Sequence, residues 1–183
     1  VLHVGTMRKG SLNVGDRVEM RVDHDHRQPI MRSHTGTHLL NHALRAVLGE
    51  HVEQKGSLVA TDRLRFDFSP TTHLNADETD KITDAVAKPV TDDLRVYAAD
   101  IPLDEAKAIH SLRAVFGERY PDPVRVVSIG KPVGDLRAKP DNKDWANFSI
   151  ELCGGTHVPT TSDIVGLEIT QEEAVAAGVR RIT

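Results

Sequence analysis

The stretch His34-Thr35-Gly36-Thr37-His38 places two histidines four residues apart. In a helix, side chains at i and i+4 lie one above the other on the same face, so the two imidazoles would converge on one point. Alone, the pair could equally be capping or core histidines. The spacing predicts a helix through this stretch and offers two nitrogen ligands for a metal ion.

A second pair with the same spacing lies in Cys153-Gly154-Gly155-Thr156-His157, near the other end of the chain. Alone, Cys153 and His157 are more typical of a buried thiol beside a surface histidine. With His34 and His38 they make one sulfur and three nitrogens, a donor set that suits a tetrahedral zinc ion. We therefore predict that these four residues form a Zn²⁺ site.

The composition is that of a globular protein, and 183 residues are enough for one sizeable core. The 23 Lys and Arg against 27 Asp and Glu give a formal net charge of −4, which excludes nucleic-acid binding through a bulk positive field. Any RNA contact is therefore expected to be local. A single cysteine rules out an internal disulfide and favours a cytoplasmic setting. We expect no membrane partner and no signal peptide, and the lack of an initiating methionine suggests a longer parent protein.

Hydrophobic periodicity and turn residues predict an α+β fold, with helices packed on a mainly antiparallel sheet. Helices are expected at residues 34–48, from Asn75 with Glu78 as a capping box to Pro89, at 103–116, and in a short acidic stretch ending at Ala177. Strands are expected at residues 18–22, 56–60, 64–68, 96–99, 124–129, 148–152, 165–170 and 178–182. The Pro-, Gly- and Lys-rich residues 131–147 are expected to form a surface loop.

Two domains are expected, because the first residues differ in pattern from the rest. Residues 1–27 are predicted to be the C-terminal part of a small β-barrel and its connector, since two or three strands cannot make a stable unit alone. Residues 28–183 would form the second domain. In the connector, His24, Asp25 and His26 are expected in a solvated loop rather than as extra ligands. His42 is expected to pack near the site without binding the metal.

The sequence resembles the editing domain of alanyl-tRNA synthetases over nearly its whole length. The matching motifs stand in the same order as in that family: His34-Thr35-Gly36-Thr37-His38-Leu39-Leu40, Gln54-Lys55-Gly56-Ser57-Leu58-Val59, Leu64-Arg65-Phe66-Asp67-Phe68, Cys153-Gly154-Gly155-Thr156-His157 and Gly178-Val179-Arg180-Arg181-Ile182. The residues before His34 look like the end of the small barrel that precedes this domain. Free-standing editing proteins and threonyl-tRNA synthetases share the two metal motifs, but the latter usually carry proline where this chain has Thr156. Residues 131–147 depart from the shorter bacterial pattern.

The resemblance implies zinc-dependent hydrolysis of the ester that joins serine or glycine to alanine-specific tRNA, tRNA(Ala). The implied partners are the acceptor end of tRNA(Ala) carrying serine or glycine and the remaining domains of a full-length synthetase. The alternatives are a threonyl-type or free-standing aminoacyl-tRNA deacylase and a non-catalytic RNA-binding module with a structural zinc.

The resemblance also implies catalytic roles for Thr37 and Gln54. The Thr37 hydroxyl could sense the hydroxyl of serine, although helix hydroxyls commonly bond to their own backbone. The first motif lacks the glutamate that serves as general base in HExxH metalloproteases, so that mechanism does not apply. Gln54 is not a strong base, but it could align a water. A catalytic zinc ion normally keeps one coordination position open, whereas four protein ligands would fill all positions. Either one ligand is loosely held, with His157 as the candidate, or the ion chiefly positions the substrate.

Arg180 and Arg181 are the candidates for tRNA binding. Successive side chains in a strand face opposite sides, so at most one of them can point to a given surface. We expect one to contact the backbone of the tRNA acceptor end and the other to make an internal pair. The alternative is that both are solvated surface charges.

Overall fold

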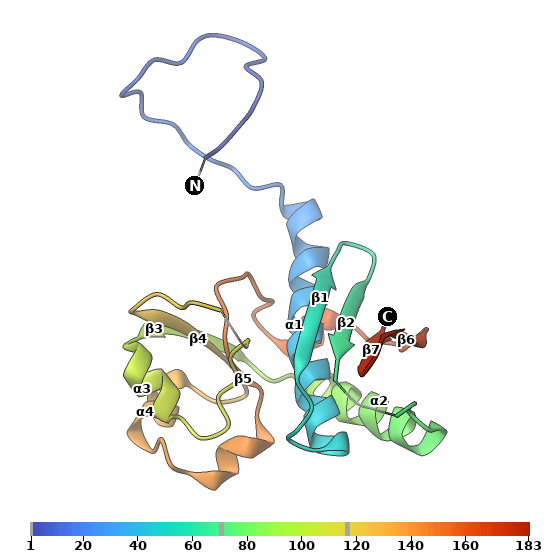
Figure 1. Ribbon diagram of the computed structural model, residues 1–183. Helices are drawn as coiled ribbons and strands as arrows, with labels where there is room; N and C mark the ends of the chain where they lie inside the picture. Colours follow the sequence, from blue (N-terminus) through green and yellow to red (C-terminus); the bar gives the residue numbers. More distant parts are fainter. Residues whose placement is uncertain (1, 70–71, 116–117) are drawn as a thin grey trace.

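The computed structural model describes residues 2–69, 72–115 and 118–183. Its strands form two sheets, in which every pairing is antiparallel. The longest helix, α1 (His24–Leu48), runs through the middle of the molecule, and the N-terminal segment projects away from the rest (Figure 1). The predicted α+β class with antiparallel strands is confirmed, with two sheets in place of one. No helix in the described ranges is long and apolar enough to cross a membrane.

The four-stranded sheet carries the larger of two hydrophobic cores. Its strands lie in the order β1 (Gln54–Val59), β2 (Leu64–Phe68), β7 (Val179–Ile182) and β6 (Glu172–Ala176). Alternation along β2 turns Phe66 and Phe68 inward, where both are fully buried together with Leu40 and Leu44 of α1. The buried face of α1 and the inward face of β2 thus meet in one core.

The three-stranded sheet has its own core. Its strands lie in the order β3 (Val96–Ile101), β4 (Val124–Ile129) and β5 (Ile150–Leu152). The strand β4 is central and almost wholly buried, as its run of β-branched residues predicts. The elements around this sheet are α3 (Leu103–Ala108), α4 (Val133–Ala138) and the 3₁₀ helix η1 (Lys143–Asn147), and η2 (Thr161–Ile164) follows β5.

Both long helices follow local sequence signals at their ends. In α1 the Asp23 side chain accepts a hydrogen bond from the backbone N–H of His26, and Gly49 ends the helix at φ 113° as expected. The helix therefore begins at His24, so the prediction of a solvated loop there is wrong. The capping box of Asn75 and Glu78 opens α2 (Ala76–Thr91) as predicted.

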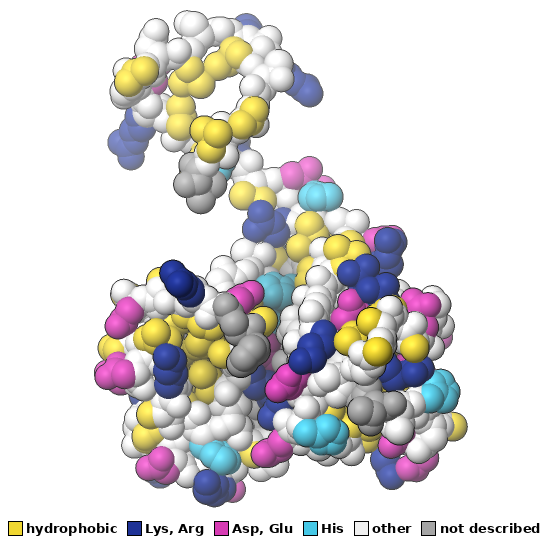
Figure 2. Space-filling view, viewed as in Figure 1, with side chains coloured by type: hydrophobic (Ala, Val, Ile, Leu, Met, Phe, Trp, Pro, Cys, Tyr) yellow, Lys and Arg dark blue, Asp and Glu magenta, His cyan; other side chains and the backbone are white. Residues whose placement is uncertain are grey.

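The N-terminal segment contains no strand among residues 2–22, which contradicts the predicted strand at 18–22. Its hydrophobic side chains are exposed along the projecting segment (Figure 2), and Met20 is 73% exposed. An alternating segment becomes a strand only where a partner satisfies its backbone groups, and the described residues offer none. The β-barrel fragment is therefore not observed. The division of the chain at residue 27 stays a proposal, and α1 passes through that position.

The regions around the three-stranded sheet differ from two predictions. The helix predicted at 103–116 ends at Ala108, because Ile109 is extended and Ser111 has a positive φ of 65°. Phe116 and Gly117 lie outside the described residues. The loop predicted at 131–147 contains α4 and η1, because Val133, Leu136 and Trp145 are buried in the second core. Burial of these apolar side chains outweighs the loop-like composition.

The C-terminal region corrects two further predictions. Residues 165–170 form no strand, since Val165 has a φ of 73° and is 77% exposed. The short acidic helix expected up to Ala177 is instead the strand β6, which pairs with β7 across a turn at Gly178, where φ is 70°. Glu and Ala favour helices in isolation, but pairing with a neighbouring strand overrides that preference.

An ion pair across β2 and β7 provides a test of the four-stranded sheet. Asp67 and Arg181 lie opposite each other, and the guanidinium donates two hydrogen bonds of 2.7 and 2.8 Å to the carboxylate. These bonds hold the pKa of Asp67 below its ordinary value. Asp67→Asn is expected to lower the free energy of unfolding by about 1 to 3 kcal/mol at pH 7.

The pH dependence of this effect follows from the direction of the pKa shift. The contribution is complete above the ordinary aspartate pKa of about 4 and is lost as the pH falls through the lowered value. Urea unfolding at pH 7 and pH 3 should therefore show a smaller difference between variant and wild type in acid. Asp62→Asn, which breaks an exposed pair with Arg63, should cost no more than about 0.5 kcal/mol. Equal effects of the two changes would contradict the structural role of Asp67.

Candidate metal centre

The structure brings the four predicted zinc ligands together. One ligating atom from each of His34, His38, Cys153 and His157 lies within 4.8 Å of the other three. The Cys153 Sγ is 3.4 Å from Nε2 of His34 and 3.4 Å from Nε2 of His157. A tetrahedral zinc ion with bonds of about 2.1 Å to nitrogen and 2.3 Å to sulfur separates its ligands by about 3.4 to 3.6 Å. These spacings suit such an ion.

His34 and His157 each have a hydrogen-bond partner at Nδ1, which leaves Nε2 for a metal. Nδ1 of His34 lies 3.1 Å from the carbonyl oxygen of Thr156. A carbonyl can only accept, so this nitrogen carries the proton and Nε2 keeps its lone pair toward Cys153. Such outer partners fix the tautomer and orientation of metal-binding histidines. The residues therefore fit a zinc ion in chemistry as well as in spacing.

His157 has a hydrogen bond at Nδ1, whereas Nδ1 of His38 is enclosed and makes no hydrogen bond among the described residues. Nδ1 of His157 lies 3.1 Å from the Thr35 hydroxyl, which also accepts the backbone N–H of Val158 at 3.2 Å. Nδ1 of His38 lies 3.5 Å from Oε2 of Glu151. Because His157 is supported as His34 is, the geometry does not single it out as a loosely held ligand.

Burial keeps the imidazoles in the neutral form that binds metals. Desolvation lowers the pKa of His38 to about 3, and it lowers the pKa values of His34 and His157 as well. Desolvation raises the pKa of the Cys153 thiol, which a bound cation would reverse. At neutral pH the site thus offers three neutral imidazoles and one thiol.

The turn that carries Cys153 and His157 is fixed by Arg125 and Gly155. The Arg125 guanidinium donates to the carbonyl oxygens of Cys153 at 3.1 Å and Gly155 at 2.5 Å. A Cβ atom added at Gly155 would lie 2.7 Å from Nδ1 of His34 and closer still to its Cε1. Only glycine lets the turn approach the His34 ring this closely.

Thr35 gives a test of the outer partners. Thr35→Val keeps the shape of a fully buried side chain but removes the hydroxyl behind His157, so zinc affinity is expected to fall about 10- to 100-fold. Competition with a chromophoric chelator measures this affinity. Thr35→Ser retains the hydroxyl and should stay close to the wild type. Equal affinity for zinc in the valine and serine variants would remove Thr35 from the support of the site.

The two predicted catalytic residues lie in different surroundings. Thr37 is 5% exposed, and its hydroxyl donates to the carbonyl oxygen of Ser33 at 2.8 Å, the backbone bond considered as the alternative. Gln54 is the first residue of β1 and lines a cavity of about 740 Å³, which we call the interlobe cavity. The cavity is also lined by Asn41, Arg113 and Glu151.

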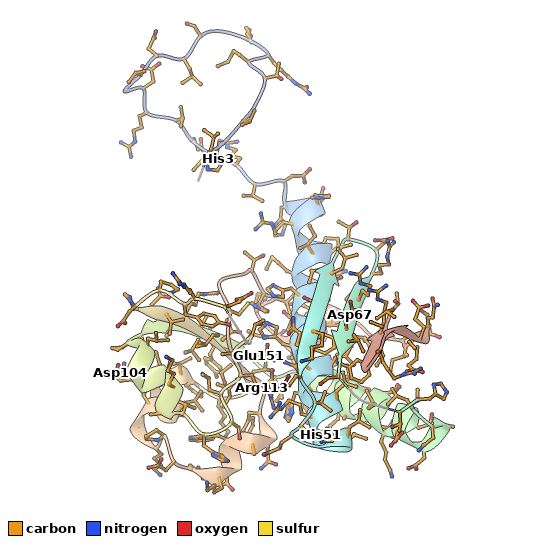
Figure 3. The ribbon with its side chains drawn as sticks, in the orientation of Figure 1. His3, His51, Asp67, Asp104, Arg113 and Glu151 are labelled. Atoms are coloured by element: carbon orange, nitrogen blue, oxygen red, sulfur yellow. The ribbon has the colours of Figure 1, made fainter. Side chains whose placement is uncertain are left out.

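Glu151 connects the interlobe cavity to the metal ligands. One of its carboxylate oxygens accepts from Asn41 at 3.0 Å, and the other faces His38. Burial raises the pKa of Glu151 to about 7, and the charge of Arg113 opposes this shift. Glu151 and Arg113 lie on neighbouring segments beside α1 (Figure 3).

The predicted tRNA-binding arginines both have partners within the protein. Arg181 pairs with Asp67, while Arg180 pairs with Glu172 and contacts Nδ1 of His73 at 3.0 Å. The Arg180 side chain is 15% exposed and that of Arg181 is 24% exposed. A contact of either with tRNA stays a prediction.

The other histidines of α1 stay outside the ligand group. His24 and His26 lie in the first turn of the helix, away from the four ligands. His42 is half-buried, and burial lowers its pKa to about 3. It is not a member of the four-residue group whose candidate ligand atoms converge.

Sequence reasoning missed the residues that support the ligands. Thr35 and Gly155 lie inside the quoted motifs but were not assigned a role, and Glu151 stands two residues before Cys153. Arg125 and Arg113 lie outside every motif, and no sequence signal connects them with the site. Their roles depend on contacts between distant segments.

Comparison with known proteins places the whole chain in one family. Residues 124–183 match the family described as "Threonyl and Alanyl tRNA synthetase second additional domain". The full chain is similar to the mitochondrial alanine–tRNA ligase of Saccharomyces cerevisiae (50% identical, 18% of that protein covered). It is also similar to the alanine–tRNA ligase of Candida albicans (54%, 19% covered) and the cytoplasmic one of Dictyostelium discoideum (50%, 20% covered).

The chain thus spans about a fifth of the length of these relatives. The similarity extends along all of it, and the motifs that contain the candidate metal ligands lie within the matched region. The chain belongs to the alanyl-tRNA synthetase family and corresponds to its editing region.

Proposed function

We propose that this chain is a zinc-dependent deacylase that hydrolyses the ester of Ser-tRNA(Ala) and Gly-tRNA(Ala) within an alanyl-tRNA synthetase. The observation that carries the proposal is the convergence of one thiol and three imidazoles, two of which, His34 and His157, have a hydrogen-bond partner at Nδ1. The acceptor end of tRNA(Ala) and the other synthetase domains are the proposed partners. A cytoplasmic location is proposed as well; relatives named cytoplasmic and mitochondrial both occur.

The need for such an activity follows from the limits of a binding pocket. A pocket shaped for alanine cannot strongly exclude glycine, which lacks one methyl, or serine, which adds one hydroxyl. A second site must then spare alanine while removing serine. Because alanine fits wherever serine fits, the second site must contain polar groups that lose a partner when the hydroxyl is missing.

Thr37 is the proposed sensor of the serine hydroxyl. Its own proton is used in the bond to Ser33, so its oxygen has a free lone pair and can only accept from a ligand. Serine can donate a proton to this oxygen and alanine cannot. The role of Thr37 is thus recognition rather than proton transfer.

Gln54 is proposed to align the attacking water. It lines the interlobe cavity with Glu151, which faces the ligand His38, and its Nε2 donates to Ser57 at 3.2 Å. In the reaction, the water oxygen bonds to the ester carbonyl carbon, the bond to the ribose oxygen breaks, and that oxygen takes up a proton. A bound zinc ion would supply Lewis-acid polarisation of the ester carbonyl or a fixed position for the amino acid.

The test is the rate at which the zinc-loaded chain hydrolyses Ser-tRNA(Ala), Gly-tRNA(Ala) and Ala-tRNA(Ala). Loss of serine and glycine with alanine spared would support the proposal. Gln54→Ala is expected to keep zinc bound and to slow the hydrolysis about 10- to 100-fold. Survival of all three esters, despite bound zinc and measured tRNA binding, would favour the structural-zinc RNA-binding module. Cleavage of Ser-tRNA(Thr) in preference to Ser-tRNA(Ala) would favour the threonyl-type deacylase.

A further inference from the structure

The residues that carry Cys153 and His157 form a turn, residues 153–157, which we call the ligand turn. Residues 153–159 contain no helix and no strand. In a helix, a spacing of four residues brings two side chains together, but in the ligand turn it does not explain the convergence. Sγ of Cys153 nevertheless lies 3.4 Å from Nε2 of His157. Some contact from outside the turn must therefore hold it in this shape.

Arg125 of β4 supplies that contact at three points. Its backbone carbonyl oxygen accepts from the N–H of Cys153 at 3.0 Å, which continues the pairing of β4 with β5 by one residue. Its side-chain Nη1 donates to the carbonyl oxygens of Cys153 and Gly155. No other side chain in the described ranges donates to a carbonyl oxygen of residues 153–155. One guanidinium nitrogen thus ties two carbonyls of the ligand turn together.

The surroundings of Arg125 indicate that holding the ligand turn is its main task. The side chain is half-buried and pairs with no carboxylate in the described part of the chain. The two carbonyls are the only acceptors that its guanidinium reaches there. Nη1 carries two N–H groups in a rigid plane, so it can serve both oxygens at once, and hydrogen bonds from a charged donor are stronger than neutral ones.

The two halves of the metal centre consequently depend on different supports. His34 and His38 both belong to α1, where helical spacing alone aligns them. In the ligand turn, His157 has the Thr35 hydroxyl at Nδ1. The only described hydrogen-bond donor to the Cys153 thiol from the backbone is the N–H of Gly155 at 3.5 Å, which lies in the turn itself. Cys153 is thus the ligand that depends most on Arg125.

We propose that Arg125 is a positioning residue of the metal centre, which holds the ligand turn in the shape that brings Cys153 and His157 to the histidines of α1. The inference rests on the proposed function in one respect, the binding of zinc at these four residues. The bonds made by Arg125 involve no ligand atom, so they hold the ligand turn with or without a metal ion. A site held in its binding shape loses less conformational freedom when the ion binds.

The first experiment compares metal binding by Arg125→Met, Arg125→Lys and the wild type. Arg125→Met keeps an unbranched apolar stem but removes the donors, so zinc affinity, measured by chelator competition, is expected to fall about 10- to 100-fold. With Co²⁺ in place of zinc, this variant should lose the near-ultraviolet thiolate-to-cobalt band and keep the visible bands of imidazole-bound cobalt. Arg125→Lys retains a charged donor and should recover the thiolate band and most of the affinity.

Arg137→Met is the matched control. It removes an arginine that is paired with Glu105 and lies outside the ligand group, so its zinc affinity and cobalt spectrum should match the wild type. If Arg125→Met binds zinc as tightly as the wild type and keeps the thiolate band, the inference is overturned. The same holds if Arg137→Met weakens zinc binding as much as Arg125→Met, since any lost arginine would then have this effect.

The second experiment uses the wild type alone and does not depend on the folding of any variant. Amide hydrogen exchange is measured for the zinc-loaded chain and after chelation. Because Arg125 holds the ligand turn without the metal, the amide of Cys153 should exchange at rates that differ by less than about 10-fold between the two samples. Loss of its protection on chelation, with the amides of β4 still protected, would show that the metal holds the turn and would overturn the inference.

Neither experiment requires hydrolysis, so the inference and the proposed function can fail separately. Loss of the thiolate band in Arg125→Met supports the positioning role even if no ester is cleaved, and the proposed function alone would then fail. Cleavage of Ser-tRNA(Ala) by the wild type, together with unchanged zinc affinity in Arg125→Met, would support the function and overturn the role of Arg125.

Discussion

Cys153→Ala is expected to abolish both zinc binding and the hydrolysis of Ser-tRNA(Ala). The thiol lies 3.4 Å from two of the three imidazoles, so its removal leaves an incomplete ligand set. Loss of a supporting outer residue typically costs 10- to 100-fold in affinity or activity, and loss of a ligand should exceed about 100-fold. Zinc content by atomic absorption and the rate of Ser-tRNA(Ala) hydrolysis measure the two effects.

The same variant distinguishes a catalytic from a structural zinc. None of the four ligands belongs to either hydrophobic core of the described chain, so Cys153→Ala should keep the secondary structure seen by circular dichroism. The free energy of unfolding should fall only by the amount that zinc binding adds to it, which is about 2.7 kcal/mol when free zinc exceeds Kd 100-fold. Unfolding of Cys153→Ala, or of the wild type after chelation, would indicate a structural zinc instead.

Gly155→Ala is expected to have the second-largest effect on zinc binding, after Cys153→Ala, although it adds only a methyl group. That methyl would overlap the His34 ring, so either the ring or the turn from Cys153 to His157 must move. Overpacking of this kind costs about 1 to 3 kcal/mol, and the displaced imidazole should reduce zinc affinity by more than about 100-fold. Chelator competition and thermal unfolding measure these two losses.

The neighbouring glycine is a matched control for this prediction. A Cβ atom at Gly154 would have no atom within 4 Å among its described surroundings, so Gly154→Ala should bind zinc like the wild type. If both variants bind zinc normally, the close approach of Gly155 to His34 does not constrain the site. If both lose zinc, the turn needs glycine for its flexibility rather than for the space beside His34.

The candidate metal site is built from two segments that are far apart in the sequence. The helix α1 supplies two ligands and Asn41, whereas the segment around β5 supplies Glu151 and the other ligands. Arg113 joins the same segment through its backbone. Changes in the contacts between α1 and the segment around β5 should therefore affect zinc affinity.

The ligand group could be predicted from the sequence because its signal is local. An i, i+4 spacing is read directly from the chain, and both pairs have it. Local signals also predicted β2, β4 and β7, the end of α1 at Gly49 and the capping box at Asn75. In each case the residues that determine the structure lie within a few positions of one another.

Predictions were wrong where a distant partner determines the local structure. Residues 172–176 have helix-forming residues, but they pair with β7. Residues 18–22 alternate like a strand, but no described strand pairs with them. The helix expected to continue to residue 116 stops at Ala108, and Arg113 lies beside β5 instead. Backbone hydrogen bonds to a neighbouring segment outweigh local preferences, and the sequence pattern does not name that neighbour.

By itself the sequence determined the α+β class, the four candidate zinc ligands and the family resemblance. Only the tertiary structure decided that the strands form two sheets and that Thr35, Glu151 and Thr156 stand behind the three imidazoles. It also enclosed two nitrogens of Arg113, Nε and Nη1, without a hydrogen-bond partner among the described residues. The physical reason is range: the members of each ligand pair are four residues apart in the chain, whereas their support comes from contacts between residues more than one hundred positions apart.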